Sequence, residues 1–235
     1  MKKTFFAISA LLILISSCSK SNPGNNSNVN PTAHTYQNLT TGSTWQYELI
    51  DNSNNQPDTS YYSLTATSGD TTINSHLYNI FLNVSDTGTA EEYYYVNNDN
   101  YYQFEQLPSL LGGGSIEELY LKDNQSVNAT WSQTTNVNID QETIPLTITD
   151  SIIGTNLTRT VNDSTYNNVI HVSSHVSSST ISAFPGSSLT SNMQYYYAPN
   201  YGLIEADVYI NLNVPLLSIS QIINTQTKII SASLK

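Results

Sequence analysis

The stretch YYYAPNYGLIEAD, from Tyr195 to Asp207, decides the fold because a related stretch, YYYVNNDNYYQFE, occurs at Tyr93 to Glu105. Both begin with a tyrosine triplet, pass through a polar turn and end in a second strand-like segment. Aromatic segments that flank Asn, Asp, Pro or Gly are typical of antiparallel strands joined by a short turn. The two stretches therefore predict an antiparallel sheet in which one motif occurs twice.

Further matches lie upstream of each triplet and keep the same order. A Thr-Trp pair places Trp45 before the first triplet and Trp131 before the second, and a Thr-x-Asn motif then precedes Tyr78 and Tyr166. The spacing exceeds the roughly 20 to 50 residues of solenoid and propeller repeats. We therefore predict one β-rich domain at 36–235, built from two related halves at about 36–119 and 120–235. A composition rich in Thr, Asn and Tyr can also imitate a repeat.

Strand-like segments recur along the whole predicted domain. TWQYELI at 44–50 and SYYSLTAT at 60–67 alternate and flank a turn rich in Asn. Two places favour a helix instead: Ser115 and Glu118 form a capping box, and residues 216–223 keep helical spacing, although this tail also fits two strands. The predicted fold class is all-β with room for one short helix, arranged either as a half-barrel or as a β-sandwich.

The N-terminus has the organisation of an export signal. Lys2 and Lys3 precede an apolar run from Phe5 to Ile15, and small residues then lead to Cys18, the single cysteine. The run is shorter than the about 20 residues that span a bilayer, so residues 1–17 are interpreted as a signal peptide. With one cysteine no intramolecular disulfide can form, and the fold must be stable through packing alone.

The sequence Ile15-Ser16-Ser17-Cys18 resembles the lipobox of bacterial lipoproteins. The resemblance implies cleavage before Cys18 and acylation of Cys18, which would attach the protein to a membrane through an N-terminal lipid. Ile15 and Ser17 depart from the Leu and the Gly or Ala that the family prefers, and the alternative is an ordinary secretory signal that leaves a free thiol. Ser19 is not the Asp that retains some lipoproteins at the inner membrane, so the resemblance implies a lipid-anchored protein of the outer membrane, on either its periplasmic or its surface-exposed face.

Composition and charge restrict the partners. Residues 18–35 contain the lipidated cysteine and a polar segment with repeated Asn, Pro and Gly, which is typical of a flexible tether. Without Lys2 and Lys3 the chain keeps five basic residues against 18 acidic ones, a formal charge of −13. This charge excludes nucleic acid as a natural partner, because binding to phosphates needs basic surfaces.

The sequence lacks the common catalytic and cofactor-binding motifs. His171 and His175 lie on a β-forming segment, where they would be about 13 Å apart, too far to share one zinc ion. Three acidic pairs have the chemistry of a glycosidase's two carboxylates, although any acidic chain contains such pairs: Glu91/Glu92, Glu117/Glu118 and Asp140/Glu142. We therefore predict no cofactor, no metal site and no enzymatic activity.

The tyrosine triplets supply the candidate binding residues. Successive strand side chains point to opposite faces, so Tyr93 pairs with Tyr95 on one face and Tyr195 with Tyr197 on one face. These four residues are hypothesised to bind a ligand; the alternative is that tyrosine serves only to form strands.

The lipobox, the polar tether and the APNYGLIEADV stretch resemble uncharacterised outer-envelope lipoproteins and, more distantly, half-barrel lipoprotein carriers. No ligand-contacting residue carries over from either group. The predicted function is a non-enzymatic cell-envelope lipoprotein that binds a glycan, a lipid or a protein partner through a Tyr-rich sheet face. The alternative is an envelope glycan hydrolase that uses a carboxylate pair.

Overall fold

The computed structural model describes residues 36–54, 56–106, 115–139 and 142–235, and these form one antiparallel sheet of twelve strands. The predicted leader, Cys18 and the predicted tether lie outside the described residues. The first six strands are β1 (Thr44–Asp51), β2 (Asp58–Ile73), β3 (His76–Ser85), β4 (Gly88–Asn97), β5 (Asn100–Gln106) and β6 (Ser115–Lys122). The last six are β7 (Thr130–Ile139), β8 (Glu142–Val161), β9 (Ser164–Ser177), β10 (Ser188–Ala198), β11 (Gly202–Val214) and β12 (Ile219–Ser233).

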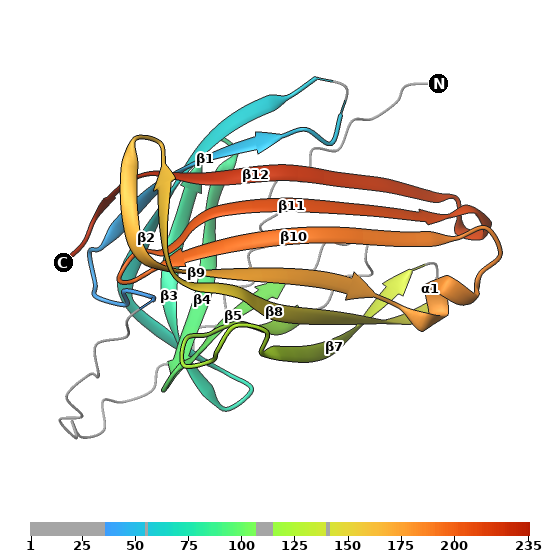
Figure 1. Ribbon diagram of the computed structural model, residues 1–235, viewed down its shortest axis with the longest axis horizontal. Helices are drawn as coiled ribbons and strands as arrows, with labels where there is room; N and C mark the ends of the chain where they lie inside the picture. The colour runs from blue at the N-terminus through green and yellow to red at the C-terminus, as the bar shows by residue number, and fades with distance from the viewer. Residues whose placement is uncertain (1–35, 55, 107–114, 140–141) are drawn as a thin grey trace.

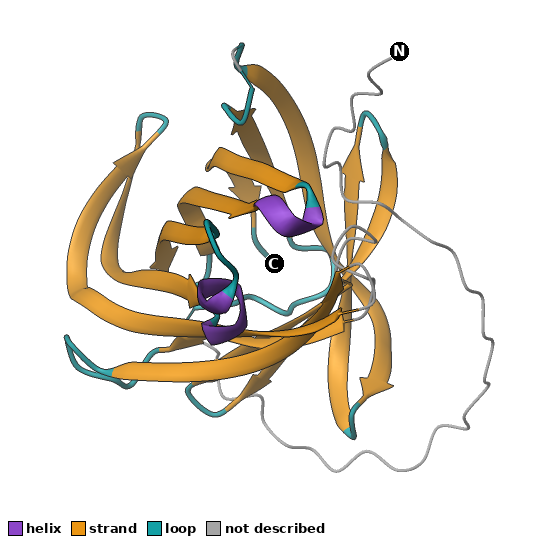
Figure 2. Cartoon of the chain, turned by 90° about the vertical axis from the view of Figure 1, so that its right-hand side faces the viewer, coloured by secondary structure: helices purple, strands orange, loops and turns teal. Residues whose placement is uncertain are grey.

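Consecutive strands pair with each other except β6 and β7, and β1 also pairs with β12. The strand order is therefore β6-β5-β4-β3-β2-β1-β12-β11-β10-β9-β8-β7. The long strands β9 to β12 run side by side, and β2 to β5 cross them steeply (Figure 1). Viewed along the other axis, the sheet curves around on itself (Figure 2). The prediction of an all-β fold is confirmed, and the sheet is a single curved layer rather than a sandwich.

Two short helical segments interrupt the meander. The helix α1 (Ser179–Ala183) begins after Ser178, whose hydroxyl oxygen accepts a hydrogen bond from the backbone N–H of Ile181. The 3₁₀ turn η2 (Pro215–Leu217) has proline in its first turn and ends at Ser218, which has a left-handed φ of 54°. Both lie toward one end of the curved sheet (Figure 2).

The stretch predicted to favour a helical turn at Ser115 forms a strand instead, since Ser115 and Glu118 lie on β6. The tail, which fitted a short helix followed by a strand as well as two strands, forms the 3₁₀ turn η2 and then β12, which contains residues 219–223 of the segment with helical spacing. Both predictions relied on local patterns of three or four residues. Pairing of β6 with β5, and of β12 with β11 from Ile219 to Lys228, satisfies more backbone groups than one helical turn could, so the tertiary context overrides the local preference.

The motifs that match in the sequence occupy corresponding strands. Trp45 is on β1 and Trp131 on β7, Tyr78 is on β3 and Tyr166 on β9, and the two triplets are on β4 and β10. Each pair is thus six strands apart in the chain. The division of the domain at about residue 119 stays a prediction.

Three groups of buried side chains fill the side of the sheet that the strands curve around. The first contains Trp45 and Phe81, whose ring centroids are 5.7 Å apart. The second gathers aromatic and aliphatic residues from β5 to β10, including Tyr101, Trp131 and Ile170. The third lies next to α1 and η2, where Ile181 and Val214 are fully buried.

Candidate functional site

The concave face of the sheet is the side on which distant strands share one hydrophobic core. Tyr120 on β6, Trp131 on β7 and Tyr197 on β10 belong to the same buried cluster. The ring centroids of Tyr120 and Tyr197 are 5.5 Å apart, although β6 and β10 are not neighbours in the sheet. The face that contains these residues is called the concave face below.

The second triplet places two tyrosines on the concave face. Tyr195 pairs with Val172 and Tyr197 pairs with Ile170, and both partners belong to the concave core. The rings of Tyr195 and Tyr197 stack at 6.4 Å. Among the described residues, the hydroxyl of Tyr195 has one hydrogen-bond partner, the thioether sulfur of Met193 at 3.6 Å, which is a weak acceptor. Burial raises the pKa of both phenols well above the ordinary value.

In the first triplet the middle tyrosine, rather than the two outer ones, lies on the concave face. Tyr94 points to the concave face, where its ring is 4.8 Å from Phe81 and 6.4 Å from Tyr120. Tyr93 and Tyr95 therefore point to the other face, where they pair with Phe104 and Tyr102. The structure brings Tyr195 and Tyr197 together and separates them from Tyr93 and Tyr95, and a binding role for any of the four stays a prediction.

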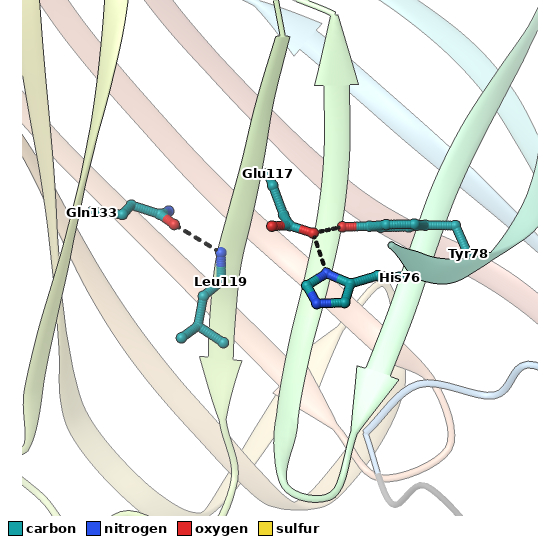
Figure 3. Close-up of polar contacts among 5 residues, drawn as sticks. All are labelled: His76, Tyr78, Glu117, Leu119 and Gln133. Carbon is teal, nitrogen blue, oxygen red and sulfur yellow. Dashed lines mark hydrogen bonds and ion pairs between the residues drawn. The ribbon is translucent and has the colours of Figure 1, made fainter. Parts of the chain in front are cut away.

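Tyr93 and Tyr95 belong to a separate aromatic group on the opposite face. The ring of His76 stacks on Tyr95 at 4.8 Å, and its Nδ1 atom is 2.8 Å from Glu117 Oε1. The same carboxylate oxygen accepts a hydrogen bond from the hydroxyl of Tyr78, so one Glu117 oxygen holds both side chains (Figure 3). Desolvation and this hydrogen bond raise the pKa of Tyr78.

Four carboxyl groups gather on the concave face: Glu92, Glu105, Glu118 and Asp150. We call them the interior acids. Glu92 lies two residues before Tyr94 and accepts hydrogen bonds from Asn83 at 2.6 Å and from the Tyr94 hydroxyl at 2.7 Å. Asp150 pairs with Trp131 and with Ser174, both buried on this face.

Desolvation raises the pKa of three interior acids, Glu105, Glu118 and Asp150. Desolvation, with the nearby charge of Glu105, raises the pKa of Glu118 to about 8. Desolvation and the charge of Glu92 raise the pKa of Glu105 to about 7. Desolvation also raises the pKa of Asp150, to about 6, although the hydrogen bond from Ser174 opposes this shift. Near neutral pH these groups can therefore donate hydrogen bonds as well as accept them.

The interior acids have unused hydrogen-bonding capacity. Asp150 is 1% exposed, and its Oδ1 atom accepts a hydrogen bond from Ser174. Its Oδ2 atom has no hydrogen-bond partner among the described residues. Glu118 is half-buried and Glu105 is exposed, so solvent reaches part of the concave face. A molecule with polar groups could therefore contact the acids from this side.

No basic side chain of the described residues pairs with the interior acids. The ion pairs in this part of the chain join His76 with Glu117 and Arg159 with Glu205. Arg159 is 2.7 Å from Glu205 and lies over the ring of Tyr196, 3.9 Å from its centroid, on the face opposite Tyr195. Among the described residues, neither lysine nor arginine therefore forms an ion pair with an interior acid.

Two of the acidic pairs singled out in the sequence, Glu91/Glu92 and Glu117/Glu118, are split between the two faces of the sheet. Because successive strand side chains point to opposite faces, Glu92 and Glu118 lie on the concave face and Glu91 and Glu117 on the other. There Glu91 accepts a hydrogen bond from the Tyr93 hydroxyl, and Glu117 accepts one from the Tyr78 hydroxyl. Asp140 lies outside the described residues. Glu105 and Asp150 were missed by the sequence analysis, because a single acidic residue in a polar strand gives no signal of burial.

The histidine pair does not form a metal site. His171 stacks on Tyr196 at 4.3 Å and contacts Gln194 at 2.6 Å, whereas His175 contacts Ser191 at 2.9 Å. Within the described ranges, no three His, Cys, Asp or Glu side chains are arranged to hold a metal ion. The same part of the chain contains no helix that is long and apolar enough to cross a membrane.

Comparisons with known proteins find similarity at the level of structure. No family model and no curated protein matches the sequence. A candidate lipoprotein from Parabacteroides distasonis is 12% identical with a TM-score of 0.46, over 85% of this chain and 99% of that one. A candidate exported protein with a YmcC-like fold from Bacteroides fragilis is 7% identical with a TM-score of 0.49, over 86% of this chain and 99% of that one.

Proposed function

We propose that the protein is a non-enzymatic lipoprotein of the outer membrane that binds a glycan or a lipid on the concave face of its sheet. The observation that supports this site is the stacked pair of Tyr195 and Tyr197 beside the interior acids. The pair and the acids lie on a face that keeps solvent-accessible surface at Glu105 and Glu118. A protein partner would be indicated by the absence of binding to both ligand classes.

The chemistry of the concave face suits an amphipathic ligand. Tyr197 is buried, but Tyr195 keeps part of its surface accessible and can offer the face of its ring to a sugar ring or an acyl chain and its hydroxyl to a polar group. Carboxyls whose pKa lies near or above neutral pH can donate a hydrogen bond to a hydroxyl or ester oxygen.

The membrane attachment rests on the sequence. The leader at 1–17 and the lipobox-like Ile15-Ser16-Ser17-Cys18 support acylation at Cys18, and the polar segment to residue 35 supports a tether. Several acyl chains on one cysteine hold a protein at the membrane essentially permanently, because each buried methylene contributes about 0.8 kcal/mol.

Binding to a glycan array and to lipid overlays tests the proposal directly. The full-length protein, purified in detergent, is compared with Tyr195→Ala and with Tyr93→Ala, its matched control on the opposite face. Tyr195→Ala should weaken binding about tenfold or more, which corresponds to about 1.4 kcal/mol, and Tyr93→Ala should leave it unchanged. Equal binding by the wild type and Tyr195→Ala would reject the concave face as the site.

One observation favours an envelope glycan hydrolase as the second candidate. A glycosidase needs a carboxyl that is protonated near neutral pH and a second carboxylate close by. The raised pKa of Glu118 meets the first condition, and Glu105 and Asp150 are near enough to influence Glu118 electrostatically. Release of reducing sugar from envelope glycans by the wild type, lost in Glu118→Gln and kept in Glu117→Gln, would establish hydrolysis in place of simple binding.

A further inference from the structure

A cleft of about 600 Å³ lies at the end of the molecule where the β8–β9 hairpin meets two other elements, and neither Tyr195, Tyr197 nor an interior acid lines it. Its walls are the start of β9, the turn between β10 and β11, and the end of β12. Figure 1 shows the hairpin rising across the ends of these strands. The volume is within the range of about 300–1,000 Å³ that is typical of small-molecule sites.

The walls of this cleft are held in place before any ligand binds. The side-chain amide of Asn162, in the hairpin turn, donates to the backbone carbonyl of Ile229 on β12 at 3.1 Å. Arg159 on the hairpin forms its 2.7 Å ion pair with Glu205 on β11. The two contacts fix the hairpin against both neighbouring strands, so a ligand would not have to order it.

The turn between β10 and β11 is equally constrained. Asn200 and Gly202 adopt positive φ values of 66° and 71°, and the N–H of Tyr201 donates to the carbonyl of Ala198 at 3.1 Å. A side chain at position 202 would approach Gln37 Oε1 to 2.7 Å, so glycine is required there. The APNYG motif therefore builds one wall of the cleft and presents Tyr201 to it.

The lining of the cleft is aromatic, polar and uncharged. Tyr166 and Tyr201 meet edge to face with ring centroids 5.1 Å apart, and Tyr201 keeps part of its surface accessible. The remaining lining side chains are Ser, Thr, Asn, Pro, Ala and Ile, without an acidic or basic residue. The side-chain amide of Asn168 and the hydroxyl of Tyr201 have no hydrogen-bond partner among the described residues. Both groups are available to a ligand.

We propose that this cleft is a second binding site, separate from the tyrosine pair and the interior acids, and that it takes an uncharged saccharide. A sugar ring offers an apolar face to Tyr201 and hydroxyl groups to Asn168 and the Tyr201 hydroxyl. A charged ligand would lose its hydration without gaining an ion pair, because no charged side chain lines the cleft. An acyl chain would leave the amide and hydroxyl groups of the lining unpaired.

Saturation-transfer NMR on the full-length protein in detergent tests this inference. The uncharged probes are maltose, cellobiose and N,N′-diacetylchitobiose, and the charged comparisons are glucuronate and glucosamine. At least one uncharged disaccharide should bind, more tightly than both charged sugars. Absence of binding by all three disaccharides, or equal binding by the charged sugars, would overturn the proposal.

Three variants locate the bound saccharide. Tyr201→Ala removes the exposed ring, and Asn168→Gly removes the amide while keeping a residue that tolerates the φ of 56° at this position. Each should weaken binding about tenfold or more, whereas Tyr61→Ala, which removes a 54% exposed tyrosine elsewhere on the sheet, should not. Thermal unfolding measures whether each variant is folded. If Tyr201→Ala does not fold, Asn168→Gly still tests the site.

The concave-face variant separates this inference from the proposed function. Loss of disaccharide binding in Tyr195→Ala, with full binding in Tyr201→Ala and Asn168→Gly, would place the saccharide on the concave face and overturn the second site. Loss in Tyr201→Ala and Asn168→Gly alone would support the second site, whatever ligand the concave face binds.

Discussion

The indole N–H of Trp131 on β7 donates a hydrogen bond to the backbone carbonyl of Leu119 on β6 at 2.7 Å. The two strands stand at opposite ends of the strand order, and within the described residues no backbone ladder joins them. Gln133, two residues along β7, accepts from the N–H of Leu119 at 3.0 Å (Figure 3). Two side chains thus satisfy both backbone groups of Leu119 and hold the edges of the curved sheet together.

Trp131→Phe should destabilise the protein by about 1–3 kcal/mol, because it removes the donor and leaves a carbonyl unpaired in a region largely shielded from water. Urea unfolding followed by far-UV circular dichroism measures this change. Ser132→Ala, on the exposed side of the same strand, is the control and should change the free energy of unfolding by less than about 0.5 kcal/mol. Equal effects of the two substitutions would show that the edges do not depend on this bond.

Glu105, Glu118 and Asp150 should make the free energy of unfolding fall as pH rises. In the folded protein the pKa of Glu118 is about 8 against an ordinary value of 4.5, so the folded state binds more protons than the unfolded state between these pH values. The free energy of unfolding therefore decreases with increasing pH across this window, and Glu105 and Asp150 act in the same direction.

Glu118→Gln should remove much of this pH dependence. At pH 8.5 it should stabilise the protein by about 1–2 kcal/mol, a value reduced by the partial exposure of the side chain, and near pH 4 it should have little effect. Unfolding in urea at the two pH values gives the comparison. Glu117→Gln is the control, because it weakens contacts with Tyr78 and His76 and should destabilise rather than stabilise. A wild-type protein that is more stable at pH 8.5 than at pH 5 would contradict the assignment.

The ion pair of Arg159 with Glu205 should matter because one partner is buried. The Glu205 side chain is 7% exposed and that of Arg159 is 35% exposed. Arg159→Leu leaves a buried carboxylate without its partner and should lower the free energy of unfolding by about 2–4 kcal/mol. The double variant with Glu205→Leu should lower the free energy of unfolding by less. A double-mutant cycle from urea unfolding gives the coupling energy. If the double variant loses the sum of the two single effects, the residues are not coupled.

Cys18 should carry the lipid. Mass spectrometry of the mature protein should find an acylated N-terminal cysteine, and the protein should partition into the detergent phase of Triton X-114. Cys18→Ser should abolish the modification and shift the protein to the aqueous phase. An unmodified thiol in the wild type would favour the alternative of an ordinary secretory signal.

The sequence predicted the fold class because strand signals are local. Segments in which apolar and polar residues alternate, separated by turns rich in Asn, recur throughout the chain. Asn98, Asn162 and Asn200 adopt the positive φ values that such turns need. The helical turn at Ser115 was predicted wrongly, since a capping box of four residues has no information about the β5 strand that pairs with it. The choice between half-barrel and sandwich depends on sheet curvature, which no short motif encodes.

The candidate site was predicted only in part, because the face of a side chain depends on register. The two triplets look alike in the sequence, yet Tyr94 is on the concave face in one, and Tyr195 and Tyr197 are there in the other. An offset of one residue exchanges the two faces of a strand. The gathering of Glu105, Glu118 and Asp150 comes from three strands and requires the closed curve of the sheet.

The most direct test of the concave face is to locate a bound ligand by NMR. The full-length protein with labelled tyrosine rings is titrated with the glycan or lipid that binds best on the arrays, and intermolecular NOEs are assigned with the Tyr→Phe variants. NOEs should connect the ligand to the rings of Tyr195 and Tyr94, and none should reach Tyr93 or Tyr95. NOEs to Tyr93 and Tyr95, with none to Tyr195 or Tyr94, would contradict the account.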